Sequence, residues 1–125
     1  MKKIISSKSA PAAIGPYSQA VEINGTLYVS GQLPIDPAAG KIVATDITTQ
    51  TEQSLKNLSA ILAEAGYGFE DVVKSTVFLS DISNFAQMND VYKKFYKTDC
   101  PARSAFAVKD LPMGALVEIE TIAAK

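Results

Sequence analysis

The chain has 125 residues, 47% of them apolar, which predicts one domain over residues 1–125 with a packed core. Its 12 basic and 13 acidic side chains nearly cancel and are scattered, so we expect no nucleic-acid partner, because phosphate binding requires clustered cations. Histidine is absent, which excludes a Ser-His-Asp triad and a His-ligated metal site, so proton transfer must use Glu, Asp, Tyr or water.

The first third of the chain predicts three short strands. Lys2–Ser6 is the first, and Ala20–Asn24 with Thr26–Gln32 is expected to form a hairpin. The Asn24-Gly25 pair supports the hairpin, because a two-residue turn between twisted strands needs positive φ at both positions.

Residues from about Asp46 to Ala65 predict a long helix. Apolar side chains recur there at helical spacing, at Ile47, Leu55, Leu58, Ile61, Leu62 and Ala65. Asp46 and a Thr49–Glu52 capping box are alternative N-terminal caps, and Gly66 provides a left-handed stop.

The second half of the chain predicts a strand, a helix and two further strands. These elements are Val72–Ser80, Ser83–Lys97, Ser104–Val108 and Leu116–Ala123, and an Asn84–Gln87 pair is a candidate cap for the helix. The order favours an α+β fold, a two-layer sandwich with a mixed, mostly antiparallel sheet and both helices on one face.

The other face of this sheet needs a cover. In the last strand Val117, Ile119 and Ala123 point one way, whereas Glu118 and Glu120 point the other way among apolar neighbours. We therefore expect subunits to meet on the helix-free face.

The sequence also indicates a compartment. Cys100 is the only cysteine, so no intramolecular disulfide forms. No apolar run is long enough for a secretory signal or a membrane span. We expect a cytoplasmic protein without a membrane partner.

Two charged positions are the main candidates for chemistry. Arg103 follows Pro101 at the entrance to a strand, where its planar fork suits a substrate carboxylate, although a lone arginine is usually a surface residue. Glu118 and Glu120 share a face with Leu116 and Ile122, whose burial of a carboxylate would raise its pKa and make it a better base near neutrality. The alternative is that one of the two acids pairs with a cation at the rim.

Four uncharged or weakly reactive side chains have ordinary explanations beside a functional one. Tyr17 packs or lines a site, and Ser30 forms hydrogen bonds rather than attacking as a nucleophile, because no histidine can activate it. Asn89, on the margin of the second helix's apolar stripe, ties down backbone or binds a ligand. Cys100 is expected to be inert.

Several motifs in a fixed order resemble the RidA/YjgF family of reactive intermediate deaminases across essentially the whole chain. They are Ala10–Gln19 (APAAIGPYSQ), Val29–Gln32 (VSGQ), Val73–Phe78 (VKSTVF), Pro101–Ser104 (PARS) and Val117–Glu120 (VEIE). The resemblance implies a chorismate-mutase-like homotrimer with three sites between subunits and no metal or organic cofactor.

Members of the archetypal branch hydrolyse 2-iminopropanoate and 2-iminobutanoate, released by pyridoxal-phosphate-dependent dehydratases, to 2-oxo acids and ammonia. Carried over by position, Arg103 binds the substrate carboxylate and Glu118 orients and activates water. Many archetypal members have Cys where this chain has Ala105, so only a main-chain contact remains there. The other implied lining residues are Tyr17, Ser30, Gly31 and Asn89.

Two other functions remain open at this point. One is a non-enzymatic binder or sensor of small 2-oxo acids, which would use the same arginine. The other is an RNA-directed activity like that of translation-inhibitor or ribonuclease relatives, against which the missing basic groove and histidine argue. The preferred imine and the choice between Glu118 and Glu120 are also open.

Overall fold

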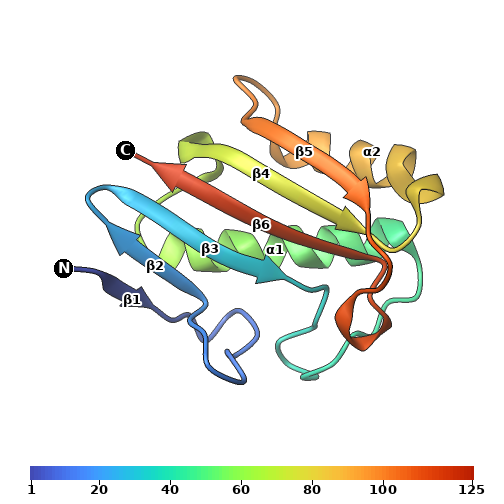
Figure 1. Ribbon diagram of the computed structural model, residues 1–125, viewed down its shortest axis with the longest axis horizontal. Helices are drawn as coiled ribbons and strands as arrows, with labels where there is room; N and C mark the ends of the chain where they lie inside the picture. Colours follow the sequence, from blue (N-terminus) through green and yellow to red (C-terminus); the bar gives the residue numbers. More distant parts are fainter.

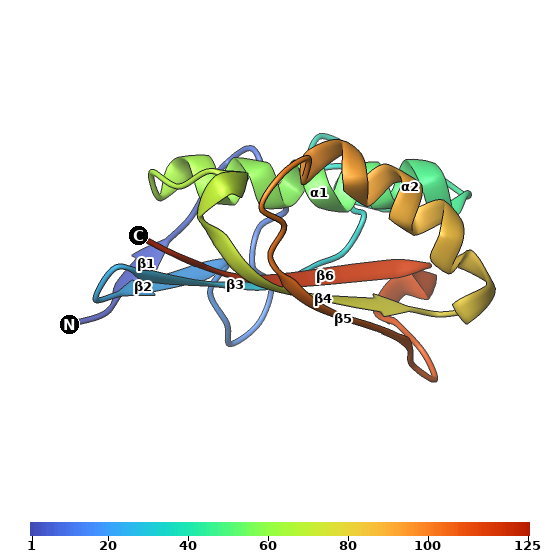
Figure 2. The same cartoon turned by 90° about the horizontal axis from the view of Figure 1, so that it is seen from above.

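The computed structural model describes residues 1–125 as one six-stranded sheet with two helices packed on one of its faces (Figures 1 and 2). Three 3-10 turns, at Phe69–Asp71, Ile82–Asn84 and Pro112–Gly114, lie between the main elements. The main elements are β1 (Lys3–Ile5), β2 (Ala20–Ile23), β3 (Thr26–Gln32), α1 (Ile47–Glu64), β4 (Val72–Leu79), α2 (Phe85–Phe95), β5 (Ala102–Ala107) and β6 (Val117–Ala124).

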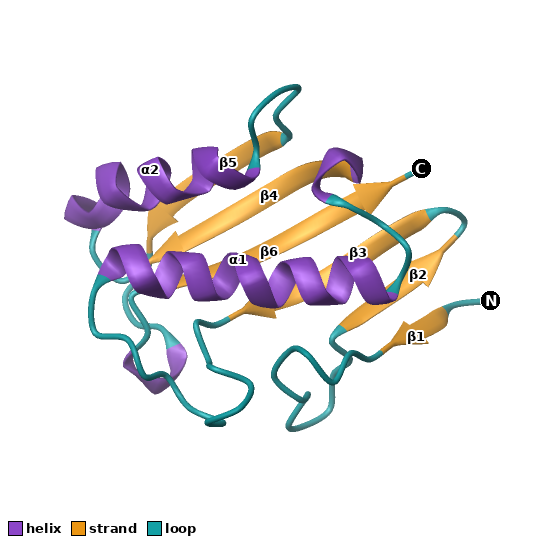
Figure 3. Cartoon of the chain, turned by 180° about the vertical axis from the view of Figure 1, so that it is seen from behind, coloured by secondary structure: helices purple, strands orange, loops and turns teal.

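The strands lie in the order β1-β2-β3-β6-β4-β5. Only β4 and β5 are parallel, because α2 crosses over between them, and the other neighbours are antiparallel. Both helices lie on the same side, which Figure 3 shows from the helix side. The predicted α+β architecture with a mixed, mostly antiparallel sheet is confirmed.

Local sequence signals explain where the first elements turn and stop. Asn24 and Gly25 have φ of 50° and 77°, as the predicted hairpin turn requires. At the start of α1 the Asp46 carboxylate accepts a hydrogen bond from the Thr49 amide at 2.8 Å, so Asp46 is the cap and not the Thr49–Glu52 box. Gly66, at φ 82°, ends the helix.

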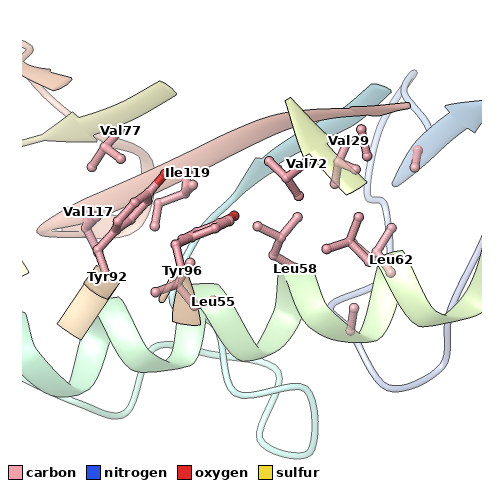
Figure 4. Packing of buried hydrophobic residues seen from close by; sticks show 14 of the residues in the cluster. Val29, Leu55, Leu58, Leu62, Val72, Val77, Tyr92, Tyr96, Val117 and Ile119 are labelled. Carbon is pink, nitrogen blue, oxygen red and sulfur yellow. The ribbon is translucent and has the colours of Figure 1, made fainter. Parts of the chain in front are cut away.

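The core lies between the helices and the sheet (Figure 4). In β6, Val117, Ile119 and Ala123 are fully buried on this side, whereas Glu118 and Glu120 alternate with them on the other. The predicted division of this strand into an apolar and an acidic face is therefore correct.

Two predicted boundaries are wrong. The second helix begins at Phe85 after a 3-10 turn, where Asp81 accepts a hydrogen bond from the Ser83 amide and Asn84 makes no side-chain cap. The strand predicted over 104–108 spans Ala102–Ala107 instead, because Pro101 blocks pairing only at its own position and the parallel ladder with β4 begins directly after it. Arg103 therefore lies inside the strand.

The face of the sheet opposite the helices is uncovered in the single chain. Tyr28 and Phe106 are 49% and 44% exposed, and Phe106 packs edge-on against Phe78 with ring centroids 5.5 Å apart. Apolar side chains on an open sheet face favour contact with another protein surface. No helix in the chain is both long enough and apolar enough to cross a membrane.

Candidate functional site

Strand register places the two charged candidates on opposite faces of the sheet. Arg103 pairs with Ser75, which pairs with the buried Thr121, and directly paired residues share a face, so Arg103 lies on the helix side. Glu118 pairs with Phe78 on the uncovered side. Within one chain, the side chains of Arg103 and Glu118 therefore lie on opposite sides of the sheet.

Arg103 is held between β5 and one side of α2. Its Nη1 donates to Asn89 Oδ1 at 2.8 Å, and its Cζ lies 4.7 Å from the centroid of the Tyr92 ring and 5.5 Å from that of Phe85. We call the surrounding depression, of about 400 Å³, the arginine pocket. It is lined by Asn89, Tyr92, Lys93, Tyr96, Cys100, Pro101 and Arg103.

The charge of Arg103 has no counter-charge in the protein. The two ion pairs of the chain join Lys56 to Glu52 and Lys93 to Asp90, so no carboxylate neutralises this guanidinium. A half-buried arginine that is held by an amide and two rings keeps donors free for an added anion. The arrangement suits a small carboxylate.

Sequence reasoning identified part of this pocket. Asn89 accepts a hydrogen bond from Arg103, which favours a role in ligand binding over a purely structural role. Tyr92 and Phe85 were not among the predicted site residues, although their i, i+4, i+7 spacing with Asn89 could have indicated one shared face. Cys100 lines the same pocket, with its Sγ 3.5 Å from the Tyr96 carbonyl oxygen.

A second depression lies on the uncovered face around Glu118. We call it the glutamate cleft, and its volume is about 550 Å³. It contains three of the predicted lining residues, Tyr17, Ser30 and Gly31, together with both acids of β6. The full lining is Ile14, Tyr17, Ser30, Gly31, Leu33, Pro112, Glu118 and Glu120.

A bulge in β3 shapes this cleft. Val29 pairs with Thr121 and Gln32 with Ile119, so two residues, Ser30 and Gly31, oppose one residue of β6. A Cβ at position 31 would lie 2.6 Å from Glu118 Oε2. Glycine is therefore needed for the carboxylate to rest against the bulge.

The glutamate cleft alters the protonation of its inner acid. Burial raises the pKa of Glu118 above its ordinary value of 4.5, and the negative charge of Glu120 raises this pKa further. Glu120 itself is exposed. A half-buried carboxylate with a raised pKa is a better proton acceptor near neutrality than an ordinary surface glutamate.

Backbone contacts fix the remaining predicted residues. The Ser30 hydroxyl donates to the Ser18 carbonyl at 2.6 Å and its amide donates to the Gln19 carbonyl at 2.9 Å, which holds the loop bearing Tyr17 against β3. Tyr17 is 53% exposed at the cleft wall. Ala105 lies on the helix side with Arg103 and packs against the core, away from the glutamate cleft.

The structure brings the predicted residues together in two groups. Arg103 and Asn89 form one, and Tyr17, Ser30, Gly31 and Glu118 form the other. Arg103 is aligned with Thr121, which lies two strands away in β6, so about 10 Å separate these two residues across the sheet. Glu118 lies three residues from Thr121, which adds about 10 Å along β6. With the sheet between them, one chain cannot place both groups around one small molecule.

Comparison with known proteins finds relatives that match nearly the whole chain. The bovine 2-iminobutanoate/2-iminopropanoate deaminase is 51% identical over 123 residues, which cover 98% of the chain and 90% of that protein. The crystal structure of a conserved Rid family protein from Yersinia pestis superposes with a TM-score of 0.98 at 51% identity over 100% of both chains.

A further structure is relevant to the site. The Escherichia coli protein TdcF, crystallised with bound serine, superposes with a TM-score of 0.94 at 42% identity, over 98% of each chain. The family model described as Endoribonuclease L-PSP matches residues 7–125. These matches over nearly the whole length show that the chain belongs to the RidA/YjgF family.

Proposed function

We propose that this protein is a hydrolase that deaminates small 2-imino acids, such as 2-iminopropanoate and 2-iminobutanoate, to 2-oxo acids and ammonia. The observation that carries the proposal is the unneutralised guanidinium of Arg103, held by Asn89 and two rings in a pocket large enough for a small organic acid. The 51% identical bovine relative is named for this activity, and TdcF was crystallised with an amino acid of similar size.

The working form in this proposal is a homotrimer whose sites lie between subunits. The uncovered sheet face carries apolar side chains that a second copy would bury, and the glutamate cleft opens on that face. A neighbouring subunit's arginine pocket then completes each site. Sedimentation at micromolar concentration tests this assembly, with a trimer expected and a monomer contradicting it.

Arg103 acts first, by binding the substrate. Its free N–H groups pair with the two carboxylate oxygens and fix the imine carbon beside a bound water. Because the protein supplies no competing carboxylate, the full charge of the guanidinium is available to the substrate. Positioning of this kind makes the attack effectively unimolecular.

Glu118 acts on the water. Its carboxylate accepts a proton while the water oxygen attacks the carbon of the protonated imine, which gives a carbinolamine. Glu118 then returns this proton to the carbinolamine nitrogen. As the C–N bond breaks and the carbonyl forms, the hydroxyl proton passes back to the Glu118 carboxylate and from there to solvent, so that ammonia and the 2-oxo acid leave. We assign this role to Glu118 rather than Glu120 because it is half-buried and its pKa is raised by burial. General-base help of this type contributes about 10²–10⁴ in rate.

The test is a coupled assay in which a dehydratase generates the imine in place. We expect the protein to accelerate release of ammonia and 2-oxo acid above the spontaneous rate, and Arg103→Ala to remove that acceleration. If the protein binds 2-oxo acids without accelerating hydrolysis, it is a sensor and not an enzyme.

An RNA-directed activity is the competing function named by the description of the family model. The chain contains no histidine for acid-base cleavage, and the glutamate cleft carries two carboxylates, which repel phosphate. We therefore expect no RNA cleavage. RNA binding that depends steeply on salt and survives Arg103→Ala would favour the competing function.

A further inference from the structure

The contacts of Arg103 come from one face of one helix. Phe85, Asn89 and Tyr92 are spaced i, i+4, i+7 in α2, so their side chains form a row along the helix. Two of the three contacts are aromatic faces, at 5.5 Å for Phe85 and 4.7 Å for Tyr92, and the third is the Asn89 amide oxygen. We propose that Tyr92 is a positioning residue that holds the Arg103 guanidinium in its carboxylate-binding orientation.

The Tyr92 ring is itself held firmly in the core. It is 5% exposed and stacks on Tyr96, one helical turn later, with ring centroids 4.5 Å apart and planes at 28° (Figure 4). A ring held in this way is a fixed support for the guanidinium, whose Cζ lies 4.7 Å from the Tyr92 centroid. The Tyr92 ring thus contacts both Tyr96 and Arg103, and all three residues line the arginine pocket.

The ring of Tyr92, and not its hydroxyl, provides the contact. The hydroxyl oxygen of Tyr92 is buried and lies near Ser75. Neither this oxygen nor the Ser75 hydroxyl oxygen forms a hydrogen bond. Burial raises the pKa of Tyr92, so the phenol stays neutral across the range in which the enzyme is assayed. Phenylalanine at this position should therefore serve as well as tyrosine.

An aromatic platform suits a guanidinium that must bind an external anion. The planar cation stacks on a ring face, which fixes its plane while leaving its N–H edge open. A carboxylate partner would fix the same group but would also neutralise it, and none is present. This role rests on the proposed function of Arg103 and predicts an effect on substrate binding more than on turnover.

The experiment compares Tyr92→Leu with Tyr92→Phe, using calorimetric affinity for 2-oxobutanoate and the kinetics of imine hydrolysis. We expect Tyr92→Leu to raise Kd and KM roughly 10-fold, the scale of a desolvated cation-π contact, and to leave kcat within about 3-fold. Tyr92→Phe should keep the affinity of the natural protein. In an Arg103→Lys background, Tyr92→Leu should have little further effect, because an ammonium does not stack as a guanidinium does.

Met88→Ala is the matched control, since Met88 is fully buried in the same helix and is not among the residues that line the arginine pocket. It should reduce stability without changing Kd. Unchanged affinity in Tyr92→Leu, or an equal loss in Met88→Ala, would overturn the proposal. If Tyr92→Leu does not fold, Tyr92→Met takes its place with the same expectation. Binding without hydrolysis in the natural protein would reject the deaminase function alone, whereas absence of 2-oxobutanoate binding would reject both.

Discussion

In the arginine pocket a cation is held by two rings and an amide of α2, whereas in the glutamate cleft a carboxylate rests against a bulge between β3 and β6. The pocket leaves the charge of Arg103 without a counter-charge. The cleft makes it harder for Glu118 to ionise, because burial and Glu120 raise its pKa. In the proposed function the first group binds an anion and the second accepts a proton.

In the proposed function neither region forms a complete site alone, because the two groups lie on opposite faces of the sheet. A pair of opposite charges in one chain would neutralise each other and lose both properties. Separation by the sheet preserves the free charge of Arg103 and the raised pKa of Glu118 within one chain, and in the proposed trimer a second subunit would bring the two groups together. The comparison therefore predicts different consequences when each group is changed.

The largest effect is expected at the arginine pocket. Arg103→Ala should lower kcat/KM for imine hydrolysis by about 10³, because it removes the only charge that binds the substrate carboxylate. Lys93→Ala is the matched control, since Lys93 lines the same pocket but pairs with Asp90 on the surface. Equal losses in the two variants would mean that general positive charge, and not a guanidinium in a fixed place, matters.

A smaller effect with a different signature is expected in the glutamate cleft. Glu118→Gln should lower kcat by about 10²–10³ while the affinity for 2-oxobutanoate changes little, because a base and not an anchor is lost. The natural protein should also lose activity as the pH falls toward the raised pKa of Glu118, and the variant should lack this limb. A collapse in 2-oxo acid affinity would show that Glu118 binds substrate.

The same variant gives a stability readout with a defined sign. A raised pKa means that the folded chain holds the Glu118 proton more tightly than the unfolded chain does, so ionisation reduces stability. This reduction appears as the pH rises from the ordinary value of 4.5 through the raised folded pKa. Thermal melts should therefore find Glu118→Gln no less stable at neutral pH, with the difference vanishing well below 4.5. A marked loss of Tm in Glu118→Gln at neutral pH would contradict the claim that ionised Glu118 destabilises the fold.

Gly31→Ala sharpens the comparison, because it changes the support of Glu118 without changing its charge. The added Cβ would meet the flexible end of the Glu118 side chain at 2.6 Å, so the carboxylate must move while the fold remains. We expect kcat to fall about 10-fold, since small misplacements of catalytic groups are costly. Natural kcat with a displaced carboxylate in a crystal structure would show that this support is unnecessary.

The smallest effect is expected at position 105. Ala105 lies on the helix side against the core, so Ala105→Cys should restore the residue common in archetypal relatives and change kcat/KM by less than about 3-fold, or roughly 0.7 kcal/mol in barrier. Steady-state kinetics check this directly. A larger gain would mean that a thiol contributes to the reaction.

The sequence was sufficient for the fold but only for part of the site. Periodicity and the Asn24-Gly25 turn predicted every main element and the two faces of β6, because these depend on local propensity and alternation. Boundaries near Pro101 and Asn84 were wrong, because tertiary pairing with β4 and the competing Asp81 cap set them.

Site geometry depends on contacts between distant segments, which one sequence does not display. The Arg103–Asn89 hydrogen bond, the platform of Tyr92 and the bulge at Gly31 all require knowledge of strand order and register. The placement of Arg103 and Glu118 on opposite faces also follows only from register. Because of this placement, a site that uses both residues requires two subunits.

Subunit mixing tests this central claim most directly. Arg103→Ala and Glu118→Gln chains, each inactive alone, are unfolded together in equal amounts, refolded and assayed for imine hydrolysis. If every site takes its arginine from one subunit and its glutamate from the next, one site in each mixed cyclic trimer is intact. Over all randomly assembled trimers about a quarter of the sites are then intact, and about a quarter of the natural activity should return. If the mixture stays as inactive as its components although mass spectrometry finds mixed trimers, the two residues do not act across a subunit boundary and the account is wrong.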